Sequence, residues 1–277
     1  MFARLSRTSR KAFVTYTVAC DPDFDASLAR MHAFVASGID MIEIGHPFSD
    51  PILDGLAIQA ANRRALAAGG NLERTFALCA AFRETDSETP LVLMGYANPI
   101  AAMGYQSFAA GAAEAGIDAL IAGDFPLREA KPLLDALAEH GLKMILMAAP
   151  TLDEADFTSD HPAVGGFLYC IPVVGPTGGP SASTEAIADS VERCRAASPL
   201  PVMVGFGIKT PDKAAAVGQI ADGVIVASAM IESFAAYLEN GKEGFLDFVG
   251  NEVQAYRQAI DNGLRIGSRR YKASHRD

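Results

Sequence analysis

Residues 41–45 read MIEIG, a short run in which apolar and small residues surround one carboxylate, Glu43. A strand that is apolar on both faces is typical of a parallel sheet covered by helices, because a sheet with one solvated face alternates apolar and polar residues. The run therefore predicts a buried strand in an α/β fold. An ionised carboxylate is costly to bury, so the presence of Glu43 needs an explanation.

Similar apolar or β-branched runs occur along the chain, at 13–19, 90–96, 119–123, 143–149, 166–172, 201–207 and 223–229. The segments between the runs space apolar residues as amphipathic helices do, at 27–38, 72–82, 107–116, 129–141, 184–197, 211–219 and 232–241. This alternation predicts a (β/α)8 TIM barrel in a single domain, residues 1–277, since no linker divides the chain. An open, doubly wound sheet is the alternative, because alternation alone does not establish closure.

Three segments add to the eightfold repeat. We expect a short surface helix in the basic segment 1–11, a rim helix within 46–70 and a closing helix over 243–260. The segment 46–70 and the long connection 175–184 each follow the carboxyl end of a predicted strand, so both lie on the same rim of the barrel. That rim is where barrel enzymes hold their catalytic groups.

Composition excludes several classes of function. The net charge is −10, and the basic residues gather at the two ends of the chain, so the body is strongly acidic and unsuited to nucleic acid. No apolar run approaches the ~18 residues of a membrane span, which predicts a soluble protein. The cysteines form no CxxC pair, so we expect a reducing cytoplasm and neither a zinc site nor disulfides: Cys20, Cys79, Cys170 and Cys194.

Small-residue turns follow the last three strand candidates: GPTGG at 175–179, GFG at 205–207 and ASA at 227–229, the last leading into a helix. In a barrel these turns are neighbours, and their backbone N–H groups with the helix N-terminus form a cradle for phosphate. The alternative is that they are ordinary turns. The expected donors are Gly178, Gly207, Ala227 and Ser228.

The carboxylates suggest acid and base chemistry. If Glu43 and Gly45 face the barrel interior, Ile42 and Ile44 pack against the helices, because side chains alternate along a strand. Burial then raises the pKa of Glu43, as a general acid requires, whereas Asp54, which we expect to be more accessible, stays ionised. The alternative is that Glu43 pairs with a cation in a structural role.

Two other kinds of chemistry fit the sequence poorly. A Schiff-base enzyme needs a lysine at the carboxyl end of a strand, but Lys143 begins its strand at the opposite end. A metal site needs clustered ligands, but His46 stands alone at the rim. Tyr169 lies in an apolar strand, where its hydroxyl either binds a reacting group or simply packs in the core.

The motif EIGHPFSDPILDG at 43–55 resembles the signature of the tryptophan synthase alpha chain family. The resemblance continues in order through 94–100, 148–151, 169–179, 204–211 and 221–229. It implies a barrel lyase that cleaves indole-3-glycerol phosphate to indole and glyceraldehyde 3-phosphate. By the same resemblance, Glu43 is the catalytic acid that protonates indole C3, and Asp54 is the second carboxylate, which stabilises positive charge at the ring N–H.

The remaining site residues are also implied by the resemblance. Tyr169 is placed near the substrate, and Tyr16 and Tyr96 are expected to hold the flat ring. The closing loop and phosphate site match Thr177, Gly178, Gly207 and Ser228. The family acts with a pyridoxal-phosphate beta chain in an α2β2 complex, so this chain itself is expected to need no cofactor, and its segments 48–55 and 98–104 match the docking rim.

Some positions depart from the family pattern. Ala227 replaces a glycine and is tolerable only if its φ stays negative, and Cys20 also stands where glycine is usual. Leu56, Pro172 and Val174 are unusual as well. These departures motivate an alternative, a catalytically weak barrel that binds and activates a beta-type partner.

Another phosphosugar barrel enzyme, an isomerase, is the remaining alternative. Such an enzyme would use an inward aspartate at the end of the first strand and a second on the far side of the barrel. Asp21 and Asp124 are the candidates for these positions.

Overall fold

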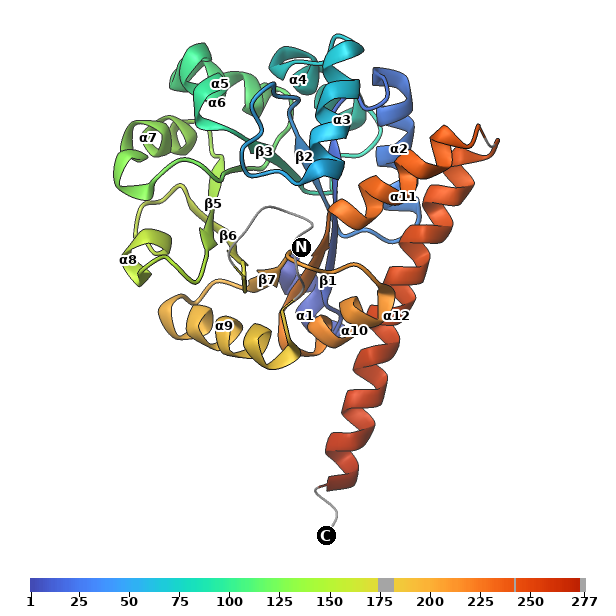
Figure 1. Ribbon diagram of the computed structural model, residues 1–277. Coiled ribbons are helices and arrows are strands. Elements are labelled where there is room, and N and C mark those ends of the chain that lie inside the picture. The colour runs from blue at the N-terminus through green and yellow to red at the C-terminus, as the bar shows by residue number, and fades with distance from the viewer. Residues whose placement is uncertain (174–181, 242, 275–277) are drawn as a thin grey trace.

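The protein is a closed barrel of eight parallel strands in chain order (Figure 1). The structure, a computed structural model, describes residues 1–173, 182–241 and 243–274. The strands are β1 (Ala12–Val18), β2 (Met41–Gly45), β3 (Leu91–Gly95), β4 (Ala119–Ala122), β5 (Lys143–Ala148), β6 (Val164–Cys170), β7 (Val202–Val204) and β8 (Gly223–Val226). Because β8 pairs with β1 in a parallel ladder, the predicted barrel is confirmed and the open sheet is excluded.

One set of helices covers the outside of the barrel: α2 (Phe24–Ala36), α4 (Leu72–Arg83), α6 (Tyr105–Glu114), α7 (Lys131–Glu139), α9 (Thr184–Ala197), α10 (Pro211–Ile220) and α11 (Ser228–Glu239). The extra elements are α1 (Phe2–Arg7), α3 (Leu56–Ala67), α5 (Ala97–Met103), the 3₁₀ turn η1 (Leu127–Glu129), α8 (Glu154–Phe157) and α12 (Phe245–Ser274). Several helices begin where a side chain caps the first turn, as when Asp23 accepts from Ala26 N and Asn71 from Arg74 N. The rim helix expected within 46–70 is α3.

Apolar residues fill two layers, one between the strands and the helices and one inside the barrel. Ile42 and Ile44 belong to the outer layer, as the alternation along β2 predicts. Helix α1 closes the amino-terminal end of the inner layer, because Leu5 is buried there and the Phe2 ring packs edge-on against Phe167, with centroids 6.2 Å apart. The predicted short surface helix is thus present, and its one buried residue, Leu5, also closes the barrel floor.

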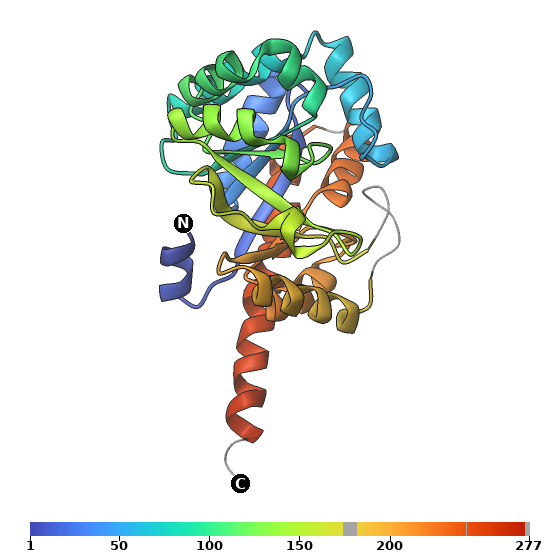
Figure 2. The ribbon, with the colours of Figure 1, turned by 90° about the vertical axis from the view of Figure 1, so that its left-hand side faces the viewer.

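Helix α12 runs alongside the barrel, and its C-terminal part projects away from it (Figure 2). It is anchored through Arg257, whose Nη1 donates to Asp40 Oδ2 and to the carbonyl of Lys11, each at 3.1 Å. Asp40 Oδ2 also accepts from the backbone N–H of Phe13 at 3.0 Å. The buried pair of Arg257 and Asp40 thus fixes α12 to the start of β1 and to the residue before β2.

Replacing Arg257 with leucine is expected to lower the free energy of unfolding by about 3 kcal/mol, because the buried Asp40 then keeps only the exposed Arg10, 4.0 Å away, as a cation. Urea denaturation measures the change. The control is Arg63→Leu on an exposed position, which should cost less than about 0.5 kcal/mol. The double variant Arg257→Leu/Asp40→Asn should recover part of the loss, and equal losses for Arg257→Leu and Arg63→Leu would contradict this account.

Candidate active site

A cavity of about 500 Å³ lies at the carboxyl ends of the strands. Each of the eight strands, or the segment directly after it, contributes a lining residue, from Tyr16 of β1 and Glu43 of β2 round to Ala227 after β8. Its surface is mainly apolar, with a few polar groups among methionine, leucine and aromatic side chains. This composition is typical of a small-molecule site.

Glu43 faces this cavity and is only 2% exposed. Its Oε2 has no hydrogen-bond partner within the part of the chain that the structure describes. Burial, and then the negative charge of Asp54, raise the pKa of Glu43 to about 8. The carboxyl group is therefore protonated at neutral pH. No described cation forms a salt bridge with Glu43, so the alternative of a structural ion pair has no support.

Asp54 lines the same cavity and is 4% exposed, so it is more accessible than Glu43 only by a small margin and is itself buried. The segment between β2 and α3 buries it, and burial raises its pKa to about 6. Hydrogen bonds from the Tyr96 hydroxyl and from Asn62 Nδ2, the latter at 3.1 Å, oppose that rise. Asp54 therefore ionises before Glu43, for a reason that sequence reasoning did not supply.

Two tyrosine hydroxyls approach glycines at the ends of neighbouring strands. A Cβ at Gly45 would lie 2.0 Å from Tyr16 Oη, and one at Gly205 would lie 2.0 Å from Tyr169 Oη. Tyr169 donates to the carbonyl of Gly205 at 3.4 Å. Burial first, and then nearby carboxylates, raise the pKa of Tyr16 and of Tyr169, so both remain neutral hydrogen-bond donors in the cavity.

Tyr96 does not belong to the described residues that line the cavity, although we expected it to hold the ring. Its hydroxyl hydrogen-bonds Asp54 and accepts from the backbone N–H of Leu53 at 3.2 Å. Its ring packs against Phe48, with centroids 5.2 Å apart. Tyr96 therefore supports the segment that carries Asp54.

Asn62 was missed by sequence reasoning. It is buried in α3, donates to Asp54 Oδ2 and accepts from the backbone N–H of Phe48 at 3.1 Å. A signal was present, because Asn62 follows Ile58 by four residues on the apolar face of its helix. A buried amide at such a position requires partners.

The phosphate end of the predicted site is only partly described. Gly207 has φ +72, a conformation that favours glycine, and Ala227 has φ −110, so its methyl group is tolerated as expected. Helix α11 begins at Ser228 without a side-chain cap, which leaves its first backbone N–H groups available to an anion. Three predicted positions lie outside the described residues: Val174, Thr177 and Gly178.

The aspartates proposed for an isomerase do not line the central cavity. Arg64 binds both oxygens of Asp21, at 2.7 and 2.9 Å, and Asp124 accepts from the backbone N–H of Ala97 at 2.8 Å. Both carboxylates are engaged in structural contacts, which removes the basis for that alternative. Among the described residues, no three histidine, cysteine, aspartate or glutamate side chains are grouped so as to hold a metal ion.

Comparison with known proteins decides the family. A family model for the tryptophan synthase alpha chain matches residues 2–260. The chain belongs to the tryptophan synthase alpha chain family. It is accordingly a lyase of tryptophan biosynthesis, and cleavage of indole-3-glycerol phosphate is the activity of this family.

Individual members of the tryptophan synthase alpha chain family agree in sequence and in fold. The alpha chain of Caulobacter vibrioides is 46% identical over 271 residues, covering 97% of each chain, and that of Gluconacetobacter diazotrophicus is 45% identical, covering 94% of this chain and 96% of the relative. The crystal structure of the alpha subunit from Legionella pneumophila superposes with a TM-score of 0.87 at 38% identity, covering 94% of this chain and 97% of that one. Within the described residues, no helix combines the length and hydrophobicity needed to cross a membrane.

The raised pKa of Glu43 predicts a pH-dependent cost in stability. In the unfolded chain Glu43 loses its proton near its ordinary value of 4.5, whereas in the folded chain it does so near 8. Rising pH therefore destabilises the parent protein across this range, and a glutamine at position 43 does not titrate. The stability gained by Glu43→Gln over the parent should grow by about 3 kcal/mol between pH 5 and pH 8.

Urea denaturation at a series of pH values measures this difference. Glu73→Gln, on the exposed side of α4, is the matched control for the loss of one glutamate. If the two variants gave the same dependence on pH, Glu43 would not be buried in its protonated form.

Proposed function

We propose that Glu43 and Asp54 catalyse indole-3-glycerol phosphate cleavage in this chain, Glu43 as the acid and then the base, and Asp54 as the carboxylate that stabilises the charged ring. The observation that carries the proposal is the buried carboxyl of Glu43, whose Oε2 has no hydrogen-bond partner among the described residues and which shares one cavity with a carboxylate of lower pKa. A pair of titratable groups whose environments separate their pKa values is the arrangement that general acid and base catalysis requires.

The reaction begins when Glu43 donates its proton to C3 of the indole ring. The positive charge that develops at the ring nitrogen is stabilised by Asp54, which accepts the hydrogen bond of the ring N–H. The ionised Glu43 then takes the proton of the hydroxyl on the adjacent side-chain carbon. As that hydroxyl becomes the carbonyl of glyceraldehyde 3-phosphate, the carbon–carbon bond breaks, and its electron pair returns to the ring to give indole. Glu43 ends the cycle protonated.

The rest of the cavity orients the substrate. Tyr16 and Tyr169 present neutral hydroxyls beside the two carboxyl groups. The start of α11 at Ser228 and the turn at Gly207 supply backbone N–H groups for the phosphate. With the phosphate held after β7 and β8, the reacting carbon lies within reach of β2, where Glu43 projects.

Replacement of either carboxyl group should abolish most activity of the isolated chain. Glu43→Gln and Asp54→Asn are each expected to lower kcat/KM for indole release from indole-3-glycerol phosphate by about 10²- to 10⁴-fold. The parent should be most active between the two pKa values, about 6 for Asp54 and about 8 for Glu43, because the mechanism needs Asp54 ionised and Glu43 protonated.

Steady-state measurement of indole release across this pH range provides the test. Asp50→Asn removes an exposed carboxylate from the same segment and should change kcat/KM by less than about three-fold in the isolated chain. Parent-like rates for both Glu43→Gln and Asp54→Asn would disprove the carboxylate mechanism. A parent chain that releases no indole alone, but stimulates a beta chain, would favour the alternative of a weak, activating barrel.

We also infer that the chain docks on a pyridoxal-phosphate beta chain in an α2β2 complex, in the cytoplasm where amino-acid biosynthesis takes place. Ile52 and Leu56 support this docking, because they are large apolar side chains with exposures of 73% and 82%. Ile52 lies on the segment between β2 and α3 and lines the cavity, and Leu56 begins α3 directly after that segment. Exposed apolar residues grouped at a rim are typical of a protein interface.

Replacing Leu56 with aspartate should weaken beta-chain binding at least 10-fold, because a charge would be buried in the interface. Leu56 is the first residue of α3, where an acidic side chain favours the helix dipole, so folding should be preserved. Binding is measured from the rise in indole release on titration with a purified beta chain.

Leu246→Asp provides a matched control for this prediction. Leu246 is also an exposed leucine, at 43%, in the first turn of a helix, but it lies in α12, far along the chain from the segment between β2 and α3. Its replacement should leave the titration unchanged. A Leu56→Asp variant that titrates like the parent would place the interface elsewhere.

A further inference from the structure

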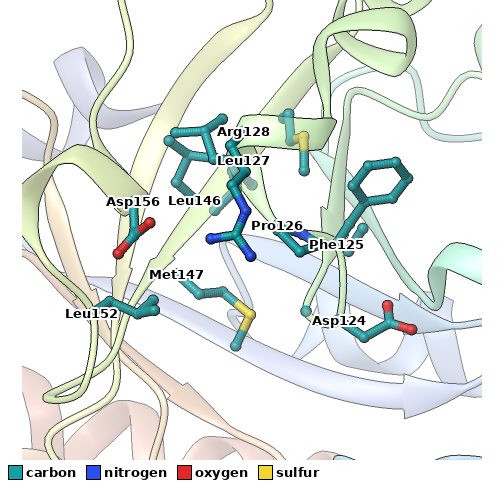
Figure 3. Close-up of a pocket in the computed structure, with 13 residues that line it drawn as sticks. Asp124, Phe125, Pro126, Leu127, Arg128, Leu146, Met147, Leu152 and Asp156 are labelled. Atoms are coloured by element: carbon teal, nitrogen blue, oxygen red, sulfur yellow. The ribbon is translucent and has the colours of Figure 1, made fainter.

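A second cavity, of about 310 Å³, runs along β5 beside the carboxyl end of β4 and adjoins the central cavity (Figure 3). The two cavities share three lining residues, Gly123, Met147 and Leu152. The catalytic scheme above uses none of them. The side cavity also contains Arg128 and Asp156, which do not line the central cavity.

Met147 is the movable part of the wall between the two cavities. Figure 3 shows its side chain extending between Leu152 and Asp124. Across from it, Gly123 has no side chain, and a Cβ there would lie 3.2 Å from Met147 Sδ. Methionine is unbranched and changes rotamer easily, so Met147 can turn aside without displacement of the backbone.

The opposite part of the wall is anchored. Arg193 of α9 donates to the carbonyl of Leu152 at 2.9 Å and to the carbonyl of Ala149 at 2.7 Å, and its guanidinium lies 5.1 Å from the ring centroid of Phe157. These contacts hold the segment between β5 and α8 in place. With that backbone held, Met147 is the side chain that we expect to move when the central cavity enlarges on this side.

The orientation of the substrate follows from the proposed function, on which this step rests. The phosphate is held after β7 and β8, and the reacting edge of the indole lies at Glu43 and Asp54 of the β2 region. The far, carbocyclic edge of the ring then faces the ends of β3, β4 and β5. Those strands present Met94, Gly123 and Met147 to the cavity.

We propose that Met147 determines specificity for the ring, and that the side cavity accepts a small polar substituent carried by the carbocyclic edge of the substrate. A hydroxyl-substituted indole-3-glycerol phosphate would pass its hydroxyl between Gly123 and the displaced Met147. Arg128 and Asp156 line the space beyond and supply a donor and an acceptor for that group. The substrate class of the site is thus wider than unsubstituted indole-3-glycerol phosphate.

The experiment compares kcat/KM for unsubstituted indole-3-glycerol phosphate with that for analogues bearing a hydroxyl at successive carbocyclic positions. At one position at least, the parent chain should accept the analogue within about 10-fold of the unsubstituted substrate, since small changes in ring fit alter kcat/KM by about 10- to 200-fold. Met147→Phe, which fills the wall with a stiffer side chain, should lower the ratio for that analogue at least 10-fold. Met147→Ala should raise the ratio of kcat/KM for that analogue to kcat/KM for the unsubstituted substrate.

Met94→Ala is the matched control, because Met94 is another partly buried methionine in the central cavity but does not line the side cavity. Met94→Ala removes the same side-chain volume from the wall of the central cavity as Met147→Ala does. It should leave the ratio of kcat/KM for the analogue to that for the unsubstituted substrate within about three-fold of the parent. Arg128→Ala should lower the ratio for the hydroxyl analogue but not for its methyl counterpart.

Each outcome bears on one of the two proposals. Two results would overturn the role of Met147. One is a parent chain that rejects every substituted analogue by more than 100-fold. The other is an equal change in the ratio of analogue to unsubstituted substrate for Met147→Phe, Met147→Ala and Met94→Ala. The proposed function fails separately, if Glu43→Gln and Asp54→Asn retain the parent rate on the unsubstituted substrate. A parent active on that substrate but insensitive at Met147 thus rejects only the inference about ring specificity.

Discussion

A carboxyl group buried inside the barrel mouth, with one oxygen that no described residue hydrogen-bonds, is the constraint on which the site depends. Leaving a buried polar atom unsatisfied costs about 1–3 kcal/mol, and Oε2 of Glu43 is such an atom. Strand β2 makes this position possible by alternation, since Ile42 and Ile44 fill the outer layer while Glu43 and Gly45 face inward. Because Gly45 has no side chain, the Tyr16 hydroxyl fits beside it. One five-residue strand therefore positions both the Glu43 carboxyl and the neighbouring Tyr16 hydroxyl.

The strands could be predicted because they obey a local rule. A run that is apolar on both faces is visible in the sequence, and β2 occupies the same five residues that its pattern predicts. Strand β7 is shorter than its run, ending at Val204 where 201–207 was expected. The reason is a contact with another strand, because Gly205 makes room for the Tyr169 hydroxyl, and Gly207 has a positive φ that a strand does not adopt. The pattern of apolar residues within one strand cannot predict a contact with a side chain of another strand.

The environment of Asp54 could not be predicted from the sequence, because it too depends on contacts between segments that are distant in the chain. Its burial depends on how the segment after β2 folds over the cavity, and its partner Tyr96 is 42 positions away in the chain. Helix α1 shows the same limit, since the basic segment predicts the surface helix that forms but not that Leu5 is buried against the barrel floor. By contrast, glycine-like geometry at Cys20 was foreseeable from the resemblance, and its φ is +62.

Both carboxyl groups are almost fully buried, and two effects separate their pKa values: hydrogen bonds to Asp54 lower its pKa, and the negative charge of Asp54 raises that of Glu43. Tyr96 and Asn62 hold the pKa of Asp54 below that of Glu43, which has no comparable donor among the described residues. Those donors act on the segment whose exposed residue Leu56 is assigned to the partner. A beta chain that shifts this segment would change the hydrogen bonds of Asp54, and with them its pKa, without contact to the substrate. Such a shift would couple docking to proton transfer through one short stretch of chain.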